Sequence, residues 1–139
     1  MSGLCYRFQV PGDDYSRAGE ASSTVKNRLK RLGVSPEAIR GVSIGLYEGE
    51  INMVSHGGGG EVTVTVSHDR VDMVLEDHGK GIPDIEKAMQ EGYSTASEEA
   101  RSLGFGAGMG LPNMKKYTDT MQIESTVSVG TTVRMTVLL

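Results

Sequence analysis

The sequence predicts a two-layer sandwich of the α/β (α+β) class, in which a mixed β-sheet is covered on one face by helices. Two observations lead to this prediction. The hydrophobic pattern follows the order strand, helix, helix, strand, strand, a long glycine-rich segment, helix, strand, strand. The length of 139 residues suits one compact domain with one modest core, so we expect residues 1–139 to form a single domain.

The first strand and two long helices are expected within the first 56 residues. Residues 4–10 have strand character, and the polar stretch 11–14 opens a helix that runs to about Leu32. Ser35 has the side chain of a helix N-cap, so a second helix is expected from there to about His56. A run of glycines follows this helix and is expected to end it.

The remaining elements are two strand pairs and a short helix. Valines alternate with polar residues over 62–67, and apolar residues alternate again over 71–75, which predicts a hairpin with one buried face. A helix is expected over about 109–117, followed by a closing strand pair around 121–123 and 133–137. These elements complete the predicted sheet.

Composition and charge exclude several classes of protein. Hydrophobic residues make up 37% and charged residues 23%, which is typical of a folded domain and not of a disordered chain. The net charge of -4 provides no basic footprint for direct nucleic-acid binding. An apolar signal core and a span of roughly 20 apolar residues are both missing from the sequence, so a cytoplasmic protein without membrane attachment is expected. Cys5, the single cysteine, is expected to be a buried structural thiol.

The second predicted helix carries an unusual polar stripe. Six residues share one sector of about 100° on it: Gly41, Gly45, Glu48, Gly49, Asn52 and His56. Apolar residues flank this sector on both sides, so the stripe should face the interior or a cleft, where an uncompensated carboxylate costs several kcal/mol. A metal–nucleotide complex would compensate: Asn52 can offer an oxygen to Mg²⁺, Glu48 can orient or deprotonate a nucleophile, and His56 can approach a phosphate. The alternative is a buried polar network that ties the helix to the sheet.

An acidic residue and two glycines follow the second strand of the predicted hairpin. Asp77 can accept the exocyclic amine of adenine, and Gly79 and Gly81 allow the backbone to pass close to the ring. An ordinary turn is the alternative. Near the start of the last strand, the hydroxyl of Thr131 can bond to the adenine edge or to the Asp77 carboxylate, although a threonine is also common in a strand.

Residues 78–110 form a segment of a length that usually marks a functional lid or disorder. Within it, residues 104–111 place four glycines at every second position, directly before a helix. The backbone amides of these glycines, together with the N-terminus of the helix, predict an anion site suited to a triphosphate. The same glycines can act as hinges for a lid, and a flexible linker is the alternative. Two other nucleotide-binding motifs are not found. The P-loop motif GxxxxGK followed by serine or threonine is absent, and the Rossmann motif GxGxxG would need glycine at Met109 or Leu111.

Taken together, these segments resemble the four ATP-binding boxes of the GHKL-type (histidine-kinase-like) ATPases, the superfamily of gyrase, chaperone, histidine-kinase and mismatch-repair ATPases. The matching segments are 48–52, 77–81, 104–110 and 130–131. Within that superfamily the chain resembles the small anti-sigma factors and serine/threonine switch kinases of the RsbT, RsbW and SpoIIAB type. The stretch 84–96 is particularly similar to the RsbT-type switch kinases. The resemblance covers nearly the whole chain.

The resemblance implies a role for each segment. Glu48 would be the catalytic base, Asn52 the Mg²⁺ ligand and Asp77 the residue that reads adenine. The lid would hold the phosphates through Gly106, Gly108 and Gly110. Further nucleotide contacts are implied at His56, Gly79, Gly81, Ile82, Gly104, Met109, Leu111 and Thr131.

The resemblance also implies a function. ATP and Mg²⁺ are the implied cofactors, and the implied activity is phosphorylation of a serine or threonine on a small antagonist (STAS-like) protein in a bacterial partner-switching system. A non-catalytic, ATP-gated module that sequesters a sigma factor or activates a phosphatase is the alternative, and relatives of this type are often homodimers. The chain departs from the family pattern at Gly49 and Met53, where alanine is common, and its lid is longer between Ala96 and Gly104.

Overall fold

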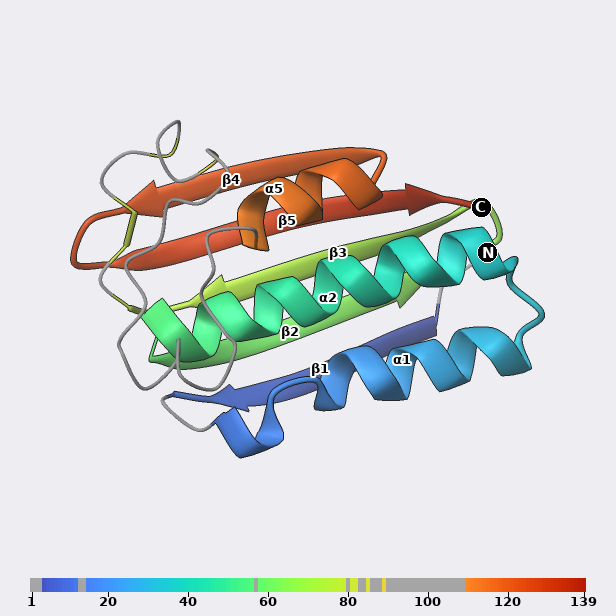
Figure 1. Ribbon diagram of the computed structural model, residues 1–139, viewed down its shortest axis with the longest axis horizontal. Coiled ribbons are helices and arrows are strands. Elements are labelled where there is room, and N and C mark those ends of the chain that lie inside the picture. The colour runs from blue at the N-terminus through green and yellow to red at the C-terminus, as the bar shows by residue number, and fades with distance from the viewer. Residues whose placement is uncertain are drawn as a thin grey trace.

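The computed structural model describes residues 4–12, 15–56, 58–79, 81, 82, 85, 89 and 110–139, with the side chains of residues 15 and 56 excepted (Figure 1). Its elements are β1 (Leu4–Pro11), the 3₁₀ helix η1 (Tyr15–Arg17), α1 (Glu20–Arg31), α2 (Pro36–His56), β2 (Gly59–Val66), β3 (Arg70–Asp77), α5 (Gly110–Tyr117), β4 (Thr120–Thr126) and β5 (Gly130–Leu138). Among the described residues, none of the helices combines the length and the apolar character that crossing a bilayer requires.

The five strands form one sheet in the order β1-β2-β3-β5-β4. Each pair of neighbouring strands is antiparallel, so the prediction of a mixed sheet is wrong in this respect. The reason is the position of β5. Strands β3 and β4 run in the same direction, but β5 lies between them and pairs antiparallel with both. The predicted two-layer architecture is otherwise confirmed.

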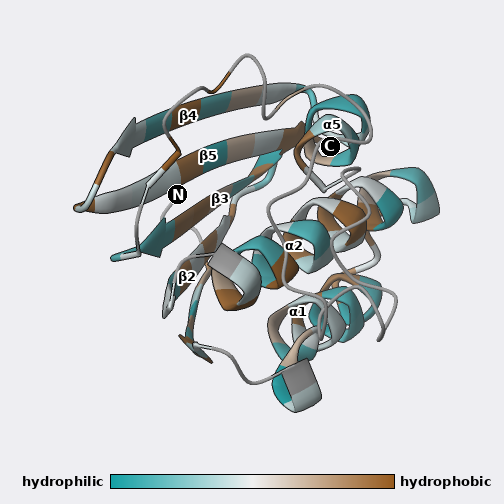
Figure 2. Cartoon of the chain, turned by 60° about the vertical axis from the view of Figure 1, so that its left-hand side comes forward, coloured by the Kyte–Doolittle hydropathy of each residue, from teal (hydrophilic) through white to brown (hydrophobic). Residues whose placement is uncertain are grey.

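Helices α1, α2 and α5 cover one face of the sheet (Figures 1 and 2). The apolar residues of the predicted alternation point into this layer and are fully or almost fully buried on β2, β3 and β5. They meet apolar residues of α1 and α2 such as Val25, Leu29, Val42 and Leu46, none of which exposes any surface. Burying each such side chain stabilises the fold by roughly 1.5–3 kcal/mol. This core fixes the position of α2 across the middle of the sheet.

The bounds of the second helix agree with the prediction. The Ser35 hydroxyl accepts a hydrogen bond from the Ala38 backbone N–H at 3.3 Å, which confirms the predicted N-cap. The first helix differs, because α1 begins only at Glu20. Gly19 precedes it with a φ of 96°, a left-handed conformation that cannot continue a right-handed helix from the residues before it.

Cys5 is exposed, so the prediction of a buried thiol is wrong. Side chains alternate between the two faces of a strand, and on β1 Tyr6 and Phe8 pack against the core. Cys5 therefore points to the face of the sheet that the helices leave open. The position of a residue within its strand decides this outcome, and composition alone does not reveal it.

Candidate functional site

Two predicted site residues of α2 converge on the start of α5. An ideal Cβ placed on Gly110 would lie 3.5 Å from Glu48 Oε2 and 3.5 Å from Asn52 Oδ1. One carboxylate and one amide oxygen thus face the N-terminus of a helix, where free backbone N–H groups and the helix dipole favour negative charge. Gly110 leaves open the space between these groups.

Glu48 is half-buried, and its electrostatics follow from that position. Burial raises the pKa of the Glu48 carboxyl above its ordinary value, and a hydrogen bond from the Asn113 side chain partly opposes this rise. Asn113 belongs to the first turn of α5. A carboxylate with a raised pKa is a better proton acceptor, and this property is typical of general bases in enzyme sites.

The glycines of the polar stripe bring α2 close to α5 and to the sheet. An ideal Cβ on Gly41 would lie 2.5 Å from the carbonyl oxygen of Tyr117, and one on Gly49 would overlap the side chain of Leu75. Gly45 lies between them and is buried as well. The sheet therefore approaches α2 closely at Gly45 and Gly49. At these three positions the close neighbours are protein atoms, and they set the distance between Glu48 and the start of α5.

Glu50 is a buried carboxylate that the sequence reasoning missed. Only 1% of its surface is exposed, and its two oxygens accept hydrogen bonds of 2.6 Å from the backbone N–H groups of Gly19 and Ser22. The glycine at the N-cap of α1 has no side chain to satisfy these donors, so α2 supplies the cap. Burial raises the pKa of Glu50, while the hydrogen bonds from the backbone lower it. The sequence offered no signal for this cap, because the start of α1 after Gly19 is known only from the structure.

Asp77 lies at the end of β3, opposite Thr131 on β5. Its Oδ1 accepts hydrogen bonds from the backbone N–H groups of Gly79 at 3.0 Å and Thr131 at 3.1 Å. The Thr131 hydroxyl instead forms a hydrogen bond of 2.8 Å with the Ser125 hydroxyl, so the prediction that it bonds to Asp77 is wrong for the hydroxyl. The strand register brings the backbone of Thr131, and not its side chain, to the carboxylate. Asp77 is thereby held in a fixed orientation.

The chain after β3 is tied to the end of β4. The backbone N–H of Ile82 donates a hydrogen bond of 2.6 Å to the hydroxyl of Ser125. Gly81 has a φ of 79°, and a Cβ there would lie 2.5 Å from the carbonyl oxygen of Thr126. Gly81 therefore allows a close approach to β4, whereas the sequence suggested a close approach to a ligand. Ser125 was not predicted, because its role depends on strand pairing.

The end of β3 and the C-terminal half of α2 are neighbours. An ideal Cβ on Gly60 would lie 2.8 Å from Asp77 Cα and 2.8 Å from Met53 Cε. Met53 directly follows Asn52 on α2. The two groups of predicted residues, on α2 and on β3, therefore gather at the same end of the molecule, where α5 also begins (Figure 1).

Several predicted site residues lie wholly or partly outside the part of the chain that the structure describes. Gly104, Gly106, Gly108 and Met109 lie outside the described residues, as does most of the predicted lid, and the side chain of His56 at the end of α2 does too. Gly110 and the buried Leu111 are the first two residues of α5. In the described part of the chain, no three His, Cys, Asp or Glu residues gather into a metal-binding cluster. Asn52, with Glu48 beside it, fits Mg²⁺ of the kind held mainly by nucleotide phosphates and few protein oxygens.

Comparison with known proteins decides the family. The model of the histidine kinase-like ATPase domain matches residues 13–137. The chain belongs to the histidine kinase-like ATPase family. An ATPase domain of this family accounts for a helix-covered antiparallel sheet whose acidic, amide and glycine residues gather at one end.

Relatives of this ATPase domain include bacterial regulators. An anti-sigma F factor of Thermoanaerobacter sp. (strain X514) is 38% identical over 100 residues, which are 72% of this chain and 62% of that protein. The chain thus spans less than two thirds of that relative's length. The serine/threonine-protein kinase RsbT of Bacillus subtilis (strain 168) is 29% identical over 78% of this chain and 79% of that protein. The anti-sigma F factor of the same organism is 30% identical over 84% and 80%.

Solved structures support the fold of the ATPase domain. The mycobacterial sensor histidine kinase MprB matches with a TM-score of 0.55 and 14% identity, over 97% of each chain. A chain of the SiaB-SiaC complex from Pseudomonas aeruginosa matches with a TM-score of 0.56 and 12% identity, over 98% of this chain and 89% of that one. At such identities the likeness concerns the fold.

Proposed function

We propose that the chain is an ATP-binding regulatory protein of a bacterial partner-switching system, and that it acts in the cytoplasm as a serine/threonine kinase on a small antagonist protein. The observation that carries the proposal is the convergence of the Glu48 carboxylate and the Asn52 amide oxygen on Gly110. The family and the names of its relatives, one a serine/threonine kinase and others anti-sigma factors, support the same function.

In this proposal ATP binds where α2 ends, β3 ends and α5 begins. Asp77 reads the adenine amine through Oδ2, because its Oδ1 is held by two backbone N–H groups. Asn52 supplies an oxygen ligand to Mg²⁺, which when bound neutralises negative charge on the phosphates. The start of α5 offers backbone N–H groups to the phosphates, and Gly104, Gly106 and Gly108 are further proposed phosphate contacts.

Glu48 is the proposed general base. It would accept the proton of the serine or threonine hydroxyl as that oxygen bonds to the γ-phosphorus and ADP departs. Burial raises the pKa of Glu48, which strengthens it as an acceptor. The Asn113 side chain holds the carboxylate toward α5. Asn52 positions the phosphate end of the nucleotide one helical turn farther along α2.

The nucleotide site is tested by calorimetric titration with ATP and ADP in the presence of Mg²⁺. We expect Mg²⁺-dependent binding by the natural chain and loss of that binding in Asn52→Ala. The matched control is Asn27→Ala, since Asn27 is an exposed asparagine on α1. A folded natural chain that binds neither nucleotide would refute the proposed function.

The kinase step is tested separately with Glu48→Ala. General-base catalysis contributes roughly 10²- to 10⁴-fold, so transfer of labelled phosphate to a STAS-like antagonist from the same organism should fall by about that factor while ATP binding persists. Undiminished transfer by this variant would exclude Glu48 as the base.

A second candidate function is an ATP-gated module that binds a partner without phosphorylating it. It is favoured by the anti-sigma factors among the relatives. In that case ATP and ADP should give different affinities for the partner, and Glu48→Ala should preserve the difference. Equal affinities with the two nucleotides would rule this candidate out.

A further inference from the structure

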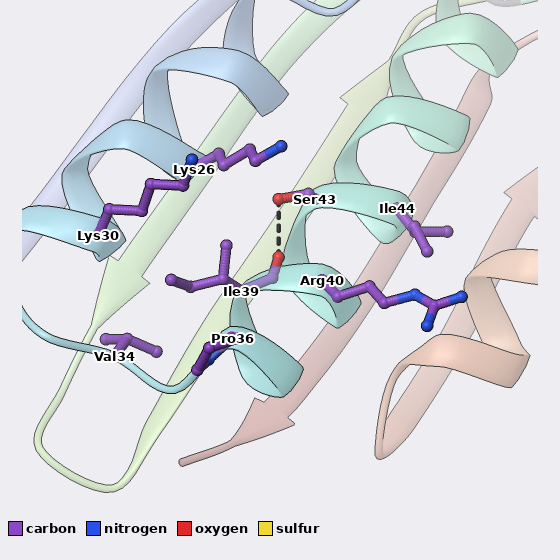
Figure 3. Close-up of a pocket in the computed structure, with 8 residues that line it drawn as sticks. All are labelled: Lys26, Lys30, Val34, Pro36, Ile39, Arg40, Ser43 and Ile44. Carbon is purple, nitrogen blue, oxygen red and sulfur yellow. Dashed lines mark hydrogen bonds between the residues drawn. The ribbon is translucent and has the colours of Figure 1, made fainter.

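A groove lies between the second half of α1 and the first half of α2, away from Glu48 and Asn52. Its volume is about 480 Å³, within the rough range of 300–1,000 Å³ that is common for ligand pockets. Figure 3 shows Lys26 reaching from α1 toward α2, while Arg40 extends from α2 toward α5 at the opposite rim. The groove is thus bordered by cations from two helices.

The groove concentrates positive charge on an acidic protein. The chain has a net charge of -4, yet the groove is lined by Lys26, Lys30 and Arg40 and by no acidic residue among those the structure describes. Neither lysine forms an ion pair with any described residue. Arg40 stacks over the Tyr117 ring, 5.4 Å from its centroid, which leaves its guanidinium edges for an anion. These charges are complementary to carboxylates.

The floor of the groove is apolar. Ile39 is buried, and Val34 and Ile44 are partly buried. The aliphatic parts of the lysine side chains extend this apolar surface. A fitting ligand therefore combines an apolar side chain with two or more neighbouring carboxylates. A nucleic acid fits less well, because the described lining offers no aromatic ring for base stacking and the whole chain is negatively charged.

We propose that this groove binds an acidic segment of a partner protein. An apolar side chain of the segment enters between α1 and α2, and adjacent carboxylates pair with Lys26, Lys30 and Arg40. The proposal rests on the proposed function only in that such a regulator acts on a protein partner. The groove itself is separate from the nucleotide site, so the two are tested independently.

The test is a fluorescence anisotropy titration of the full chain with a labelled peptide in which leucines at helical spacing alternate with glutamates. The control peptide carries glutamine at each glutamate. We expect saturable binding of the acidic peptide and about tenfold weaker binding of the glutamine peptide, because carboxylates would pair with three cations. No saturable binding of the acidic peptide, or equal binding of both peptides, would overturn the proposal.

A matched pair of variants locates the binding surface. Lys26→Glu/Lys30→Glu reverses two charges that line the groove, whereas Arg28→Glu/Arg31→Glu makes the same charge change at exposed positions of α1 outside it. We expect about tenfold weaker peptide binding in the first variant, and less than about threefold in the second at physiological salt, where more distant charges are screened. Equal losses in the two variants would indicate unspecific attraction and refute the groove.

Two further measurements complete the test. Ile44→Ser should weaken peptide binding while circular dichroism stays unchanged, since Ile44 forms part of the apolar floor. Single-stranded DNA that binds more tightly than the peptide, with the same dependence on Lys26 and Lys30, would make the groove a nucleic-acid site and refute the proposal. Mg²⁺–ATP binding is measured on the natural chain and on each groove variant, and the variants should keep it. If the natural chain binds Mg²⁺–ATP but not the acidic peptide, the groove alone is refuted. If the natural chain binds the peptide but not Mg²⁺–ATP, the proposed function alone is refuted.

Discussion

Two glutamates of α2 that lie only two positions apart have different surroundings. Successive helical residues are separated by about 100°, so Glu48 and Glu50 point in nearly opposite directions. Glu48 faces the start of α5, while Glu50 is buried against the start of α1. Burial raises the pKa of both carboxyls. Only Glu50 receives hydrogen bonds from two backbone N–H groups in return, so its role is structural, whereas Glu48 keeps its carboxylate for the proposed chemistry.

Substitution of Glu50 by glutamine should destabilise the fold. The amide NH₂ would face a backbone N–H of Gly19 or Ser22, and leaving one buried donor unsatisfied costs about 1–3 kcal/mol. Urea unfolding followed by circular dichroism measures the loss. The matched control is Glu20→Gln, an exposed position at the start of α1 whose change should stay within about 0.5 kcal/mol. Equal unfolding midpoints for the two variants would contradict the capping role.

The raised pKa of Glu48 predicts a pH-dependent stability. Folding favours the protonated carboxyl, so the native state loses stability as pH rises from the unfolded-state pKa, about 4.3, through the higher folded-state pKa. Glu48→Gln removes this loss. Its free energy of unfolding, relative to the natural chain, should therefore increase with pH across that window and then level off. Urea titrations at several pH values measure this, and a difference that is independent of pH would contradict it.

The proposed catalysis requires the ionised form of the Glu48 carboxyl, whereas stability favours its protonated form. A general base must be ionised, so the proposed phosphotransfer should decline as pH falls through the raised pKa of Glu48. The charge that costs stability above this pKa is the charge that the chemistry needs. In the proposed mechanism the uncompensated charge of Glu48 serves catalysis, in contrast to the charge of Glu50, which is compensated by hydrogen bonds within the fold.

At the scale of elements, α2 is the helix on which the site is built. It lies across the sheet, and its glycines let α5 pack closely beside it. The same helix carries Glu48 and Asn52, so the distance between α2 and α5 also sets the geometry between these side chains and Gly110. Packing and site geometry therefore depend on the same residues.

Gly41→Ala should disturb this pair of helices. The new Cβ would lie 2.5 Å from the Tyr117 carbonyl oxygen, a backbone atom that moves only if α5 moves. We expect a net loss of about 1–3 kcal/mol and weaker ATP binding. Gly45→Ala is the control, because its nearest contacts are the Thr118 methyl and the flexible Met135 side chain, at 3.2 and 3.3 Å. An equally large effect at Gly45 would argue against a specific contact with α5.

At the scale of the whole molecule, features that depend on neighbouring residues could be predicted from the sequence, and features that depend on residues far apart in the chain could not. Ser35 and the glycine run defined α2, because caps and helix breakers act on their own neighbours. The antiparallel order of the sheet was missed, since it depends on β5 lying between β3 and β4. The Glu50 cap was missed for the same reason: it joins residues about thirty positions apart.

The same distinction between local and non-local features applies to the candidate site. Glu48, Asn52 and Asp77 were predicted from residue type and periodicity, and the structure places all three at one end of the molecule. Ser125 was not predicted, because only the register of β4 against β5 brings its hydroxyl to Thr131. Chemistry could be inferred from sequence where a single helix presents it, but contacts between strands depend on how the strands pair in the folded protein.

Ligand binding to the native state should stabilise the whole molecule. At a free ligand concentration of 100 times Kd, binding adds about 2.7 kcal/mol, which corresponds to an increase in Tm of roughly 10 °C for a chain of this size. Mg²⁺–ATP should therefore raise the Tm of the natural chain. Asn52→Ala should lose this increase, whereas Lys26→Glu/Lys30→Glu should keep it, because the groove lies at the other half of α2.

Differential scanning fluorimetry with and without nucleotide measures these shifts. ATP with a metal chelator serves as the control for the Mg²⁺ ligand, since a shift that needs no metal would place the interaction elsewhere than Asn52. An undiminished increase in Tm in Asn52→Ala would likewise place the interaction elsewhere than Asn52. If Lys26→Glu/Lys30→Glu also loses the increase in Tm, the two ends of α2 are energetically coupled. The acidic peptide must then alter the affinity for ATP, and by linkage ATP must alter the affinity for the peptide by the same factor.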